Sequence, residues 1–279
     1  MSKLLWDQTG EKTYETGVDH GILFPTLVTT ANSNNYATDG KAWNGLTAVN
    51  ESPSGAEAEK IYADNIVYLT LTSAEEYSAT IEAYTYPDEF ADCNGETQAF
   101  AGVTFGQQAR KTFGFVFRTI KGNDVDGDKF GYELHLLYGL KASPSSKDHS
   151  TVNDSPEAVQ MSWEINSTPV AFTTNTEFKP VSTIVIDSTK VDAVKYVQFE
   201  DLLNGIDANT AARYVKTNDK TKQTKDYYTK GTDGTYTPFQ GDAFVAGVTY
   251  YQQVPAVTTA ADPVMPTPQY VYDFFKPAA

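Results

Sequence analysis

The sequence predicts a mainly β protein, on the basis of its composition, its turn residues and its hydropathy pattern. Tyr and Phe are abundant, with 18 and 15 copies, as are Thr and Val, whereas Leu, Arg and above all Met, with 3 copies, are scarce. The 19 Gly and 13 Pro are spread along 279 residues, as in chains of many strands joined by turns. From about residue 61, apolar residues recur at every second position. We therefore expect a β-sandwich with one flanking α-helix, an extended N-terminal arm and loops, and a small inserted β module.

Alternating apolar residues identify the expected strands. In residues 111–120, Phe113, Phe115 and Phe117 fall on one face, which is typical of a strand with one buried side. Residues 122–128, rich in Gly, Asn and Asp, predict a hairpin loop after that strand. The same period, or a short apolar run, places further strands at residues 76–86, 132–138, 159–165 and 181–186.

One helix is expected near residues 189–206. Thr189 and Asp192 have the spacing of a capping box, with Thr189 as the N-cap and Asp192 reaching back, and Gly205 ends the helix. The apolar residues that would share one face are Val191, Val194, Phe199, Leu202, Leu203 and Ile206.

The first 60 residues are rich in turn residues and show few periodic apolar positions. A segment this irregular predicts an extended arm, and its aromatic and aliphatic side chains predict that the arm docks on another subunit. The candidate contact residues are Trp6, Tyr14, Phe24, Trp43 and Leu46.

Residues 210–258 differ from the rest of the chain. They hold six basic and four acidic residues, which is a net charge of +2. Since the whole chain carries −15, the remainder carries −17. Tyrosine pairs at 227–228 and 250–251 flank Gly- and Asp-containing turns, which predicts a small β module with Tyr227, Tyr228, Tyr250 and Tyr251 as candidate surface aromatics. Beyond it, the apolar residues 270–275 are expected to form a last strand.

Charge and cysteine content limit the classes of function. With 36 acidic and 21 basic residues, the chain is poorly suited to grip nucleic-acid phosphates. The acidity fits plain solubility, and it also fits a wall along which DNA passes without adhering. Cys93 is the single cysteine, so there is no internal disulfide framework. We expect no secretory leader and no membrane span.

No sequence motif predicts catalysis, and neither a cofactor nor a metal ion is expected. His20, His135 and His149 are far apart in the sequence, with no spacing that suggests a triad or a metal site. The acidic neighbours of Cys93 should raise its pKa and not activate it. The carboxylate pairs 75–76 and 88–89 are expected to be solvated turn charges, because adjacency alone does not build a glycosidase cleft.

Asp124, Asp126 and Asp128 have the spacing that opens an EF-hand calcium loop. The pattern then fails, because Lys129 stands where the loop needs Gly and His135 stands where it needs Glu. These three residues therefore predict an acidic hairpin tip.

Several long stretches resemble the major tail proteins, or tail tube proteins, of long-tailed bacteriophages (siphophages), particularly those that infect Gram-positive bacteria. The resemblance covers about residues 12–206 in order and departs after Gly205, where residues 210–258 are an insertion. The stretches that carry it are residues 14–18, 43–57, 62–66, 83–90, 111–114 and 150–157, and the helix preceded by residues 186–190.

The resemblance implies a tail-tube-type sandwich in which six copies close into a ring around a lumenal β-barrel. Rings would stack into a tube through which DNA passes without specific binding, in a virion assembled in the cytoplasm of the host bacterium. Its partners would be further copies of the chain and the tape measure, tail terminator and distal tail proteins. Residues 1–209 would form the tube domain, 210–258 a module on the tube exterior, and 259–279 a segment returning to the tube domain.

Within that arrangement, strands in residues 61–86 and 111–138 are expected to contribute to the lumen, and the arm of about residues 1–60 to contacts between rings. Glu82, Asp124, Asp126 and Asp128 are the candidate acidic residues of the channel or its loops. A cell-surface or carbohydrate-binding β protein is the alternative, because exposed aromatics of the module could stack on sugars. An enzyme such as a glycosidase has no motif to support it.

Overall fold

The computed structural model describes residues 4–27, 36–145, 147, 149, 151 and 158–277. Strands make up 44% of it and helices 9%, which confirms the prediction of a mainly β protein. Part of the N-terminal segment (28–35) and most of the stretch 150–157 lie outside the described residues.

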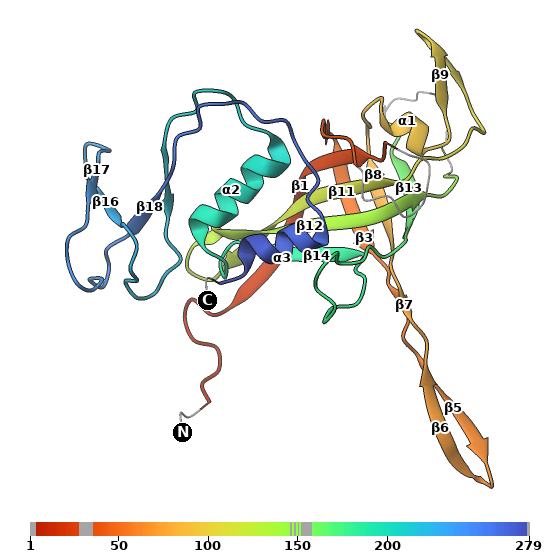
Figure 1. Ribbon diagram of the computed structural model, residues 1–279, viewed down its shortest axis with the longest axis horizontal. Helices are drawn as coiled ribbons and strands as arrows, with labels where there is room; N and C mark the ends of the chain where they lie inside the picture. Colours follow the sequence, from red (N-terminus) through yellow and green to blue (C-terminus); the bar gives the residue numbers. More distant parts are fainter. Residues whose placement is uncertain are drawn as a thin grey trace.

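One antiparallel sheet of eight strands forms the body of the molecule (Figure 1). Its order is β2-β1-β11-β12-β13-β8-β3, and β14 also pairs with β12. The sheet curls until β3 contacts β1, so one continuous sheet brings its two ends toward each other. The strands are β1 (Thr13–Pro25), β2 (Lys41–Trp43), β3 (Leu46–Glu51), β8 (Ser78–Ala83), β11 (Phe113–Asn123), β12 (Gly127–Ala142), β13 (Met161–Ser167) and β14 (Thr183–Asp187).

The concave side of this sheet holds an aromatic core. Phe113, Phe115 and Phe117 all point into it, which confirms the predicted buried stripe. Trp163 of β13 lies at its centre, with its ring 5.5 Å from that of Trp43 and 5.3 Å from that of Phe90. Edge-to-face contacts of this kind add to the burial of large rings, so the cluster holds the two ends of the sheet together.

Two helices, α2 (Ala193–Asn204) and α3 (Pro268–Phe275), cover the convex side of the sheet (Figure 1). The alternate side chains of β11 and β12 form a second core with residues of both helices. The main buried contributors are Val116, Leu134, Leu136 and Tyr138 from the strands, and Tyr196, Phe199, Leu203 and Val271 from the helices.

The start of α2 differs from the prediction. Asp192, and not Thr189, is the N-cap, because its carboxylate accepts a hydrogen bond from the backbone N–H of Lys195 (3.0 Å). Thr189 instead donates its hydroxyl to Asp187 (2.6 Å) in the turn before the helix. Gly205 ends the helix as predicted, with φ of +76°.

The prediction of a last strand at residues 270–275 is wrong, since these residues form α3. Thr267 caps the helix by accepting from the backbone N–H of Tyr270 (3.2 Å), and Pro268 follows at the first helical position. A short apolar run has no decisive period, and here the Thr-Pro start signal outweighs the β-rich composition.

The expectation of an irregular arm over the first 60 residues is also wrong. β1 is a 13-residue strand between β2 and β11, and β2 and β3 of the same segment also belong to the main sheet. Its pairing with β11 is interrupted twice between Thr16 and Ile22, where Gly17 and His20 have positive φ. These irregularities break the alternation by which a strand is recognised in sequence.

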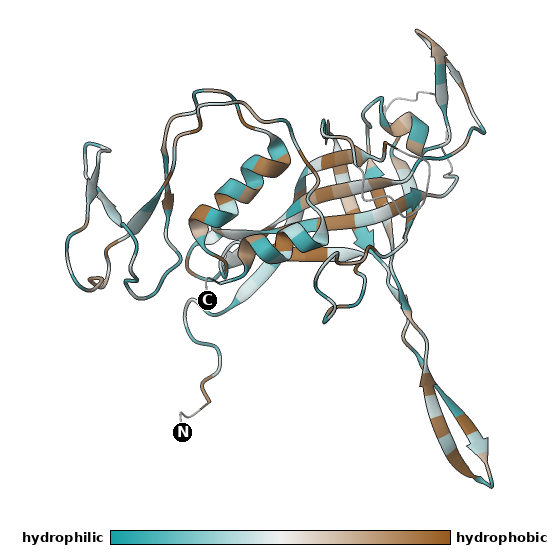
Figure 2. Cartoon of the chain, in the orientation of Figure 1, coloured by the Kyte–Doolittle hydropathy of each residue, from teal (hydrophilic) through white to brown (hydrophobic). Residues whose placement is uncertain are grey.

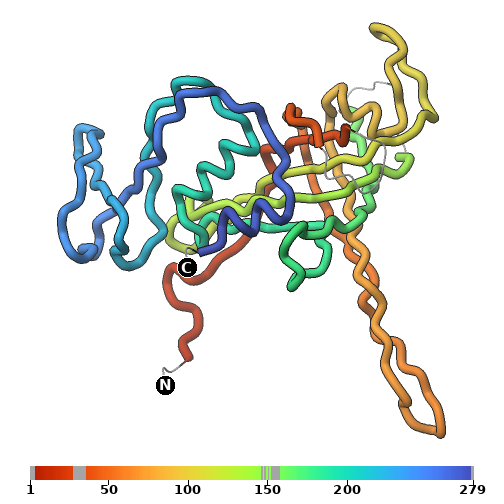
Figure 3. Tube along the Cα trace, in the orientation of Figure 1, coloured from red at the N-terminus to blue at the C-terminus, as the bar shows by residue number. Residues whose placement is uncertain are grey.

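Two hairpins project from the sheet (Figures 1 and 3). The longer one continues β3 and β8 outward through β4 (Ser54–Gly55) and β7 (Glu75–Glu76) to β5 (Ala58–Ala63) and β6 (Ile66–Thr72). The shorter one, β9 (Thr97–Phe100) and β10 (Val103–Phe105), follows the short helix α1 (Phe90–Cys93).

Residues 213–254 contain a separate four-stranded sheet, in the order β15-β18-β16-β17. Its strands are β15 (Arg213–Lys216), β16 (Tyr228–Lys230), β17 (Tyr236–Pro238) and β18 (Tyr250–Val254). The chain enters and leaves it along two segments that pair with each other, through bridges Ile206–Ala261 and Thr210–Val257. The module contacts helix α2, where Arg213 forms an ion pair with Asp201.

Replacing Asp192 with Ala should lower the free energy of unfolding by about 1 kcal/mol, because the first turn of α2 loses its cap. Burial alone would raise the pKa of Asp192, but hydrogen bonds from Lys225 and from the backbone N–H of Lys195 hold it below its ordinary value of 3.8. The charged carboxylate therefore stabilises the fold fully above about pH 4, and this contribution disappears as the pH falls through the lowered pKa.

Urea denaturation at pH 7 and at pH 3 measures both effects. Asp192→Asn is the matched variant, since it keeps a capping oxygen while removing the charge; it should lose less stability than Asp192→Ala and show a weaker pH dependence. Equal stability of all three proteins at pH 7 would rule out the cap.

Candidate functional site

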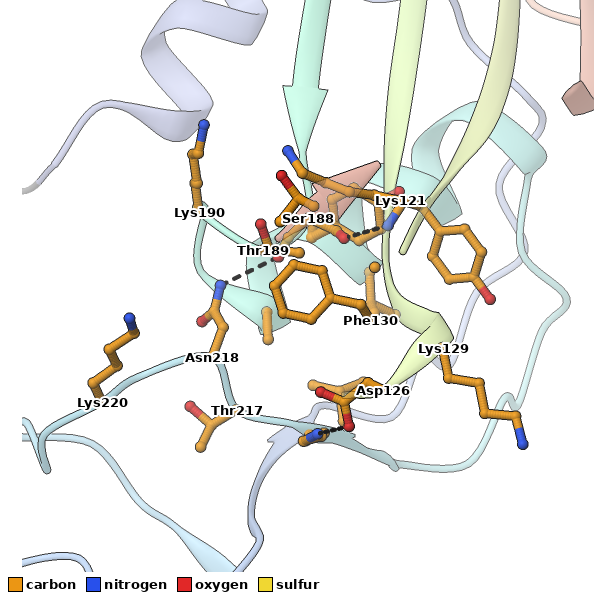
Figure 4. A pocket seen from close by; sticks show the side chains of 18 of the residues that line it. Lys121, Asp126, Lys129, Phe130, Ser188, Thr189, Lys190, Thr217, Asn218 and Lys220 are labelled. Atoms are coloured by element: carbon orange, nitrogen blue, oxygen red, sulfur yellow. Dashed lines mark hydrogen bonds and ion pairs between the residues drawn. The ribbon is translucent and has the colours of Figure 1, made fainter. Parts of the chain in front are cut away.

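A cleft of about 730 Å³ lies between the β11–β12 hairpin, α2 and β15 (Figure 4). Phe130 stands within it, and Lys129, Lys190 and Lys220 lie around it. One wall belongs to the main sheet and the other to the four-stranded module, so the cleft is the seam between these two parts.

The charges of this cleft are largely paired across the seam. Lys216 lies 3.9 Å from Asp126, and Lys220 lies 3.9 Å from Glu11. Deeper in, Lys121 contacts both Glu133 (2.6 Å) and Asp187 (2.5 Å).

The hydroxyl groups of Ser188 and Thr189 in the cleft form hydrogen bonds with the backbone and within the turn before α2. The Ser188 hydroxyl accepts from the N–H of Tyr132 (2.8 Å), and the Thr189 hydroxyl is bound to Asp187. The described lining residues include no His or Cys, and the carboxylate beside the Thr189 hydroxyl is held in an ion pair with Lys121. The geometry is that of a seam between the two parts of the chain.

The β5–β6 hairpin is a different kind of surface, because its apolar side chains are exposed along its whole length (Figure 2). Tyr62, Ile66 and Tyr68 are each about two-thirds exposed, and Ile61 faces Leu69 across the strands. Asp64 and Asn65 form the tight turn at its tip, both with positive φ. A two-stranded hairpin is marginally stable alone in water, and a contiguous exposed apolar patch of this kind is typical of an interaction surface.

The β9–β10 hairpin repeats this feature on a smaller scale. Phe100 is 65% exposed and Phe105 55% exposed. Sequence reasoning did not find either hairpin as a contact surface, although the Asp64-Asn65 pair between apolar residues is a hairpin signal.

The structure separates the five residues that the sequence suggested for contacts between subunits. Trp6 is 76% exposed and Tyr14 49% exposed, so both are available to another subunit. Phe24 and Trp43 are buried in the two cores of the chain, and Leu46 packs against the core around Trp43. The prediction that Phe24 and Trp43 contact another subunit is therefore wrong, because both side chains pack inside their own subunit.

The four acidic candidates lie at two places. Asp124, Asp126 and Asp128 are exposed at the β11–β12 hairpin, whose loop was correctly predicted. The Asn123 side chain organises this turn by accepting from the N–H groups of Val125 and Asp126. Glu82, on β8, is partly buried and accepts hydrogen bonds from Asn50 and Gln160.

The candidate tyrosines of the module fall into two groups. Tyr227 and Tyr250 are buried in its own small core, with Phe239 and Phe244. The partly exposed Tyr228 and Tyr251 join Tyr214 and Tyr236 in a second cluster, which we call the tyrosine face. The strand register places these four side chains on the sheet side opposite Arg213, which is the side bound to α2.

The reactive side chains considered in the sequence are mostly isolated. Cys93 is buried in the aromatic core, and burial, with a smaller contribution from Asp92, raises its pKa to about 12. His20 contacts Asp19 (3.0 Å) and His149 is exposed. The pairs Glu75–Glu76 and Asp88–Glu89 are exposed, as solvated turn charges are.

His135 is the exception, because it does converge with carboxylates. It lies with Glu15 and Glu133 at the end of the aromatic core, with the nearest ligand atoms of all three within 4.8 Å of one another. The spacing of Glu133 and His135, two apart on one strand, was a usable signal, but the position of Glu15 depends on the pairing of β1, which the sequence did not reveal.

Comparison with protein-family models and with curated protein sequences gives no match. In the described part of the chain, no helix combines the length and hydropathy that spanning a bilayer requires.

Proposed function

We propose that this chain is a structural subunit that assembles into a tube, and that the tube is the tail tube of a long-tailed bacteriophage. The β5–β6 hairpin carries the proposal, because it presents seven apolar side chains that are at least 36% exposed. These are Ile61, Tyr62, Ile66, Val67, Tyr68, Leu69 and Leu71.

A second copy of the same chain is the partner that best fits the hairpin. A two-stranded arm reaching away from the body can lie on a neighbour without moving its own sheet (Figure 1). Each fully buried Leu, Ile or Tyr of this kind contributes roughly 1.5–3 kcal/mol, so a few contacts suffice to hold two subunits. Because one copy's hairpin contacts a different surface of the next, the interface is head-to-tail, which closes into rings or extends into tubes.

The sheet edges support the same assembly. β2 and β3 are the ends of the strand order and leave backbone groups unpaired. Joining such edges between copies removes them and gives a closed barrel. The resemblance to tail tube proteins specifies this further as rings of six copies, stacked axially, in a virion assembled in the bacterial cytoplasm together with the tape measure, tail terminator and distal tail proteins.

The charge distribution fits a conduit. The chain without residues 210–258 carries −17, and Asp124, Asp126 and Asp128 are exposed at one hairpin. An acidic lumen repels the DNA backbone and keeps it from adhering during transit. The role is thus one of assembly, without catalysis or cofactor.

Electron microscopy of the purified chain tests the proposal. At high protein concentration we expect rings and hollow tubes in negative stain, with a six-fold ring in averaged end views. A strictly monomeric particle at high concentration and in the presence of the other tail components would contradict it.

The tyrosine face supports a second candidate function, namely binding of a cell-surface glycan. Tyr214 and Tyr236 stack 4.1 Å apart, and the face also carries Lys216, Lys230 and Gln253, which can donate hydrogen bonds to sugar hydroxyls. Aromatic faces flanked by such donors suit carbohydrates, and the basic module suits an anionic one.

A glycan array probed with the full chain tests this candidate. Tyr236→Ser should reduce binding at least ten-fold, whereas Tyr62→Ser, on the distant hairpin, should leave it unchanged. Absence of binding to anionic glycans by the unaltered chain would exclude the candidate while leaving the tube proposal intact.

A further inference from the structure

The cluster at the end of the aromatic core is set by three neighbouring strands. β1 supplies Glu15, and β12 supplies Glu133 and His135. Thr119 of β11 lies between them, directly opposite Glu133 in the sheet. The His135 ring stacks on Phe117 with centroids 4.5 Å apart and planes 5° from parallel, so its orientation is fixed.

The distances suit a shared cation. Nε2 of His135 lies 3.4 Å from Oε1 of Glu15, and the ligand atoms of all three residues lie within 4.8 Å. Ligands of a tetrahedral ion with bonds of about 2.1 Å are roughly 3.4 Å apart, so His135 and Glu15 already have the spacing of two such ligands. One imidazole nitrogen and two carboxylates are a ligand set that Zn²⁺ and similar ions accept.

We propose that Glu15, Glu133 and His135 bind one divalent transition metal ion of the Zn²⁺ type, with water completing the coordination. His135 provides Nε2, and each carboxylate provides one oxygen. The Thr119 hydroxyl keeps its hydrogen bond to Glu15 (2.6 Å) and gives up its contact with Nε2 (3.0 Å).

Groups behind the ligands are in place to orient them. His135 is only 8% exposed, and its Nδ1 atom is buried without a hydrogen-bond partner. This Nδ1 atom lies 3.9 Å from Oε1 of Glu51 on β3. A metal-bound histidine commonly donates its second N–H to a carboxylate, which is the role open to Glu51. Lys121 holds Glu133 from the other side (2.6 Å).

The charge balance favours a cation. Lys121 contacts Glu133 and Asp187, and the exposed Lys190 also contacts Asp187, while Glu15 and Glu51 approach His135. With neutral His135, four carboxylates and two ammonium groups leave a net charge of −2 in a partly buried place. A divalent ion offsets it, and protonation of His135 offsets only one unit.

Metal titration of the untagged, chelator-treated full chain tests the proposal. Calorimetry with Zn²⁺ should show one saturable site per chain, and Co²⁺ should give a visible absorption band of the same stoichiometry. Glu15→Gln, at a half-exposed position that leaves the fold intact, should weaken binding at least ten-fold. Glu51→Gln should also weaken it about ten-fold while the stoichiometry stays at one.

Two controls separate this site from others on the chain. His149→Gln and Asp128→Asn change an exposed histidine and an exposed carboxylate elsewhere, and both should bind Zn²⁺ as the unaltered chain does. Absence of a saturable site in the unaltered chain, or unchanged binding by both Glu15→Gln and His135→Gln, would overturn the proposal. A monomeric chain can be titrated as well as a tube, so this result is independent of the proposed assembly.

Discussion

Replacing residues 58–72 with Asn-Gly should abolish tube formation and leave a folded monomer. The β5–β6 hairpin is exposed throughout, so the two cores lose nothing when it is removed. The free energy of unfolding should change by less than about 1 kcal/mol, as for other exposed sites. Assembly should be lost, because the apolar side chains that we propose as the contacts between copies are gone. Sedimentation velocity and negative-stain microscopy measure the assembly, and thermal unfolding measures the fold.

Point substitutions distinguish the side chains from the presence of the hairpin. Tyr62→Ser with Tyr68→Ser should raise the protein concentration needed for assembly at least ten-fold, since two large exposed rings lose their contacts. Lys60→Gln, in the same strand, should leave it unchanged. Tubes of normal length from the shortened chain would show that another surface joins the subunits.

Trp163→Ala should lower the free energy of unfolding by about 3–5 kcal/mol, the range for deleting a buried aromatic side chain. Trp163 is 2% exposed, and its ring lies 5.5 Å from both Trp43 and Tyr86 and 5.3 Å from Phe90. Trp43 belongs to β2 at one end of the sheet, whereas Tyr86 and Phe90 follow β8 near the other end, so the cavity would loosen the closure of the sheet. A loss of this size is a large fraction of the total stability of a typical domain. Guanidinium denaturation followed by fluorescence of the remaining tryptophans measures it.

Tyr84→Ala is the matched control, because Tyr84 is close in sequence to the core strand β8 but 51% exposed. Its effect should stay within about 0.5 kcal/mol. A loss below about 1.5 kcal/mol for Trp163→Ala would mean that the core collapses around the missing ring.

The strands with regular alternation were predictable from the sequence. Phe113, Phe115 and Phe117 mark β11 because every second side chain enters the core, and the Gly- and Asp-rich loop after them makes a hairpin with β12. β1 was not predictable, because Gly17 and His20 break its period in the middle. Missing this strand also hid Glu15, and with it the convergence on His135.

The sequence did not determine where helix α2 begins, because more than one residue near its start could act as the N-cap. Both Thr189 and Asp192 can cap a helix, and the second does so because Thr189 is engaged with Asp187. The residue type also does not determine whether an aromatic side chain is buried. Trp6 and Trp43 both fall in the turn-rich segment, yet one is 76% and the other 3% exposed, because only Trp43 belongs to a strand of the curled sheet.

The two segments that join residues 213–254 to the rest of the chain run side by side, held by the bridges Ile206–Ala261 and Thr210–Val257. Such a stem brings the two ends of the insert together, so any domain whose own termini are adjacent could be spliced in at this point without stretching the host. In a homopolymer, every copy would then carry the passenger at a regular spacing. The stem is therefore a natural site for genetic exchange of modules and for engineered display of foreign proteins.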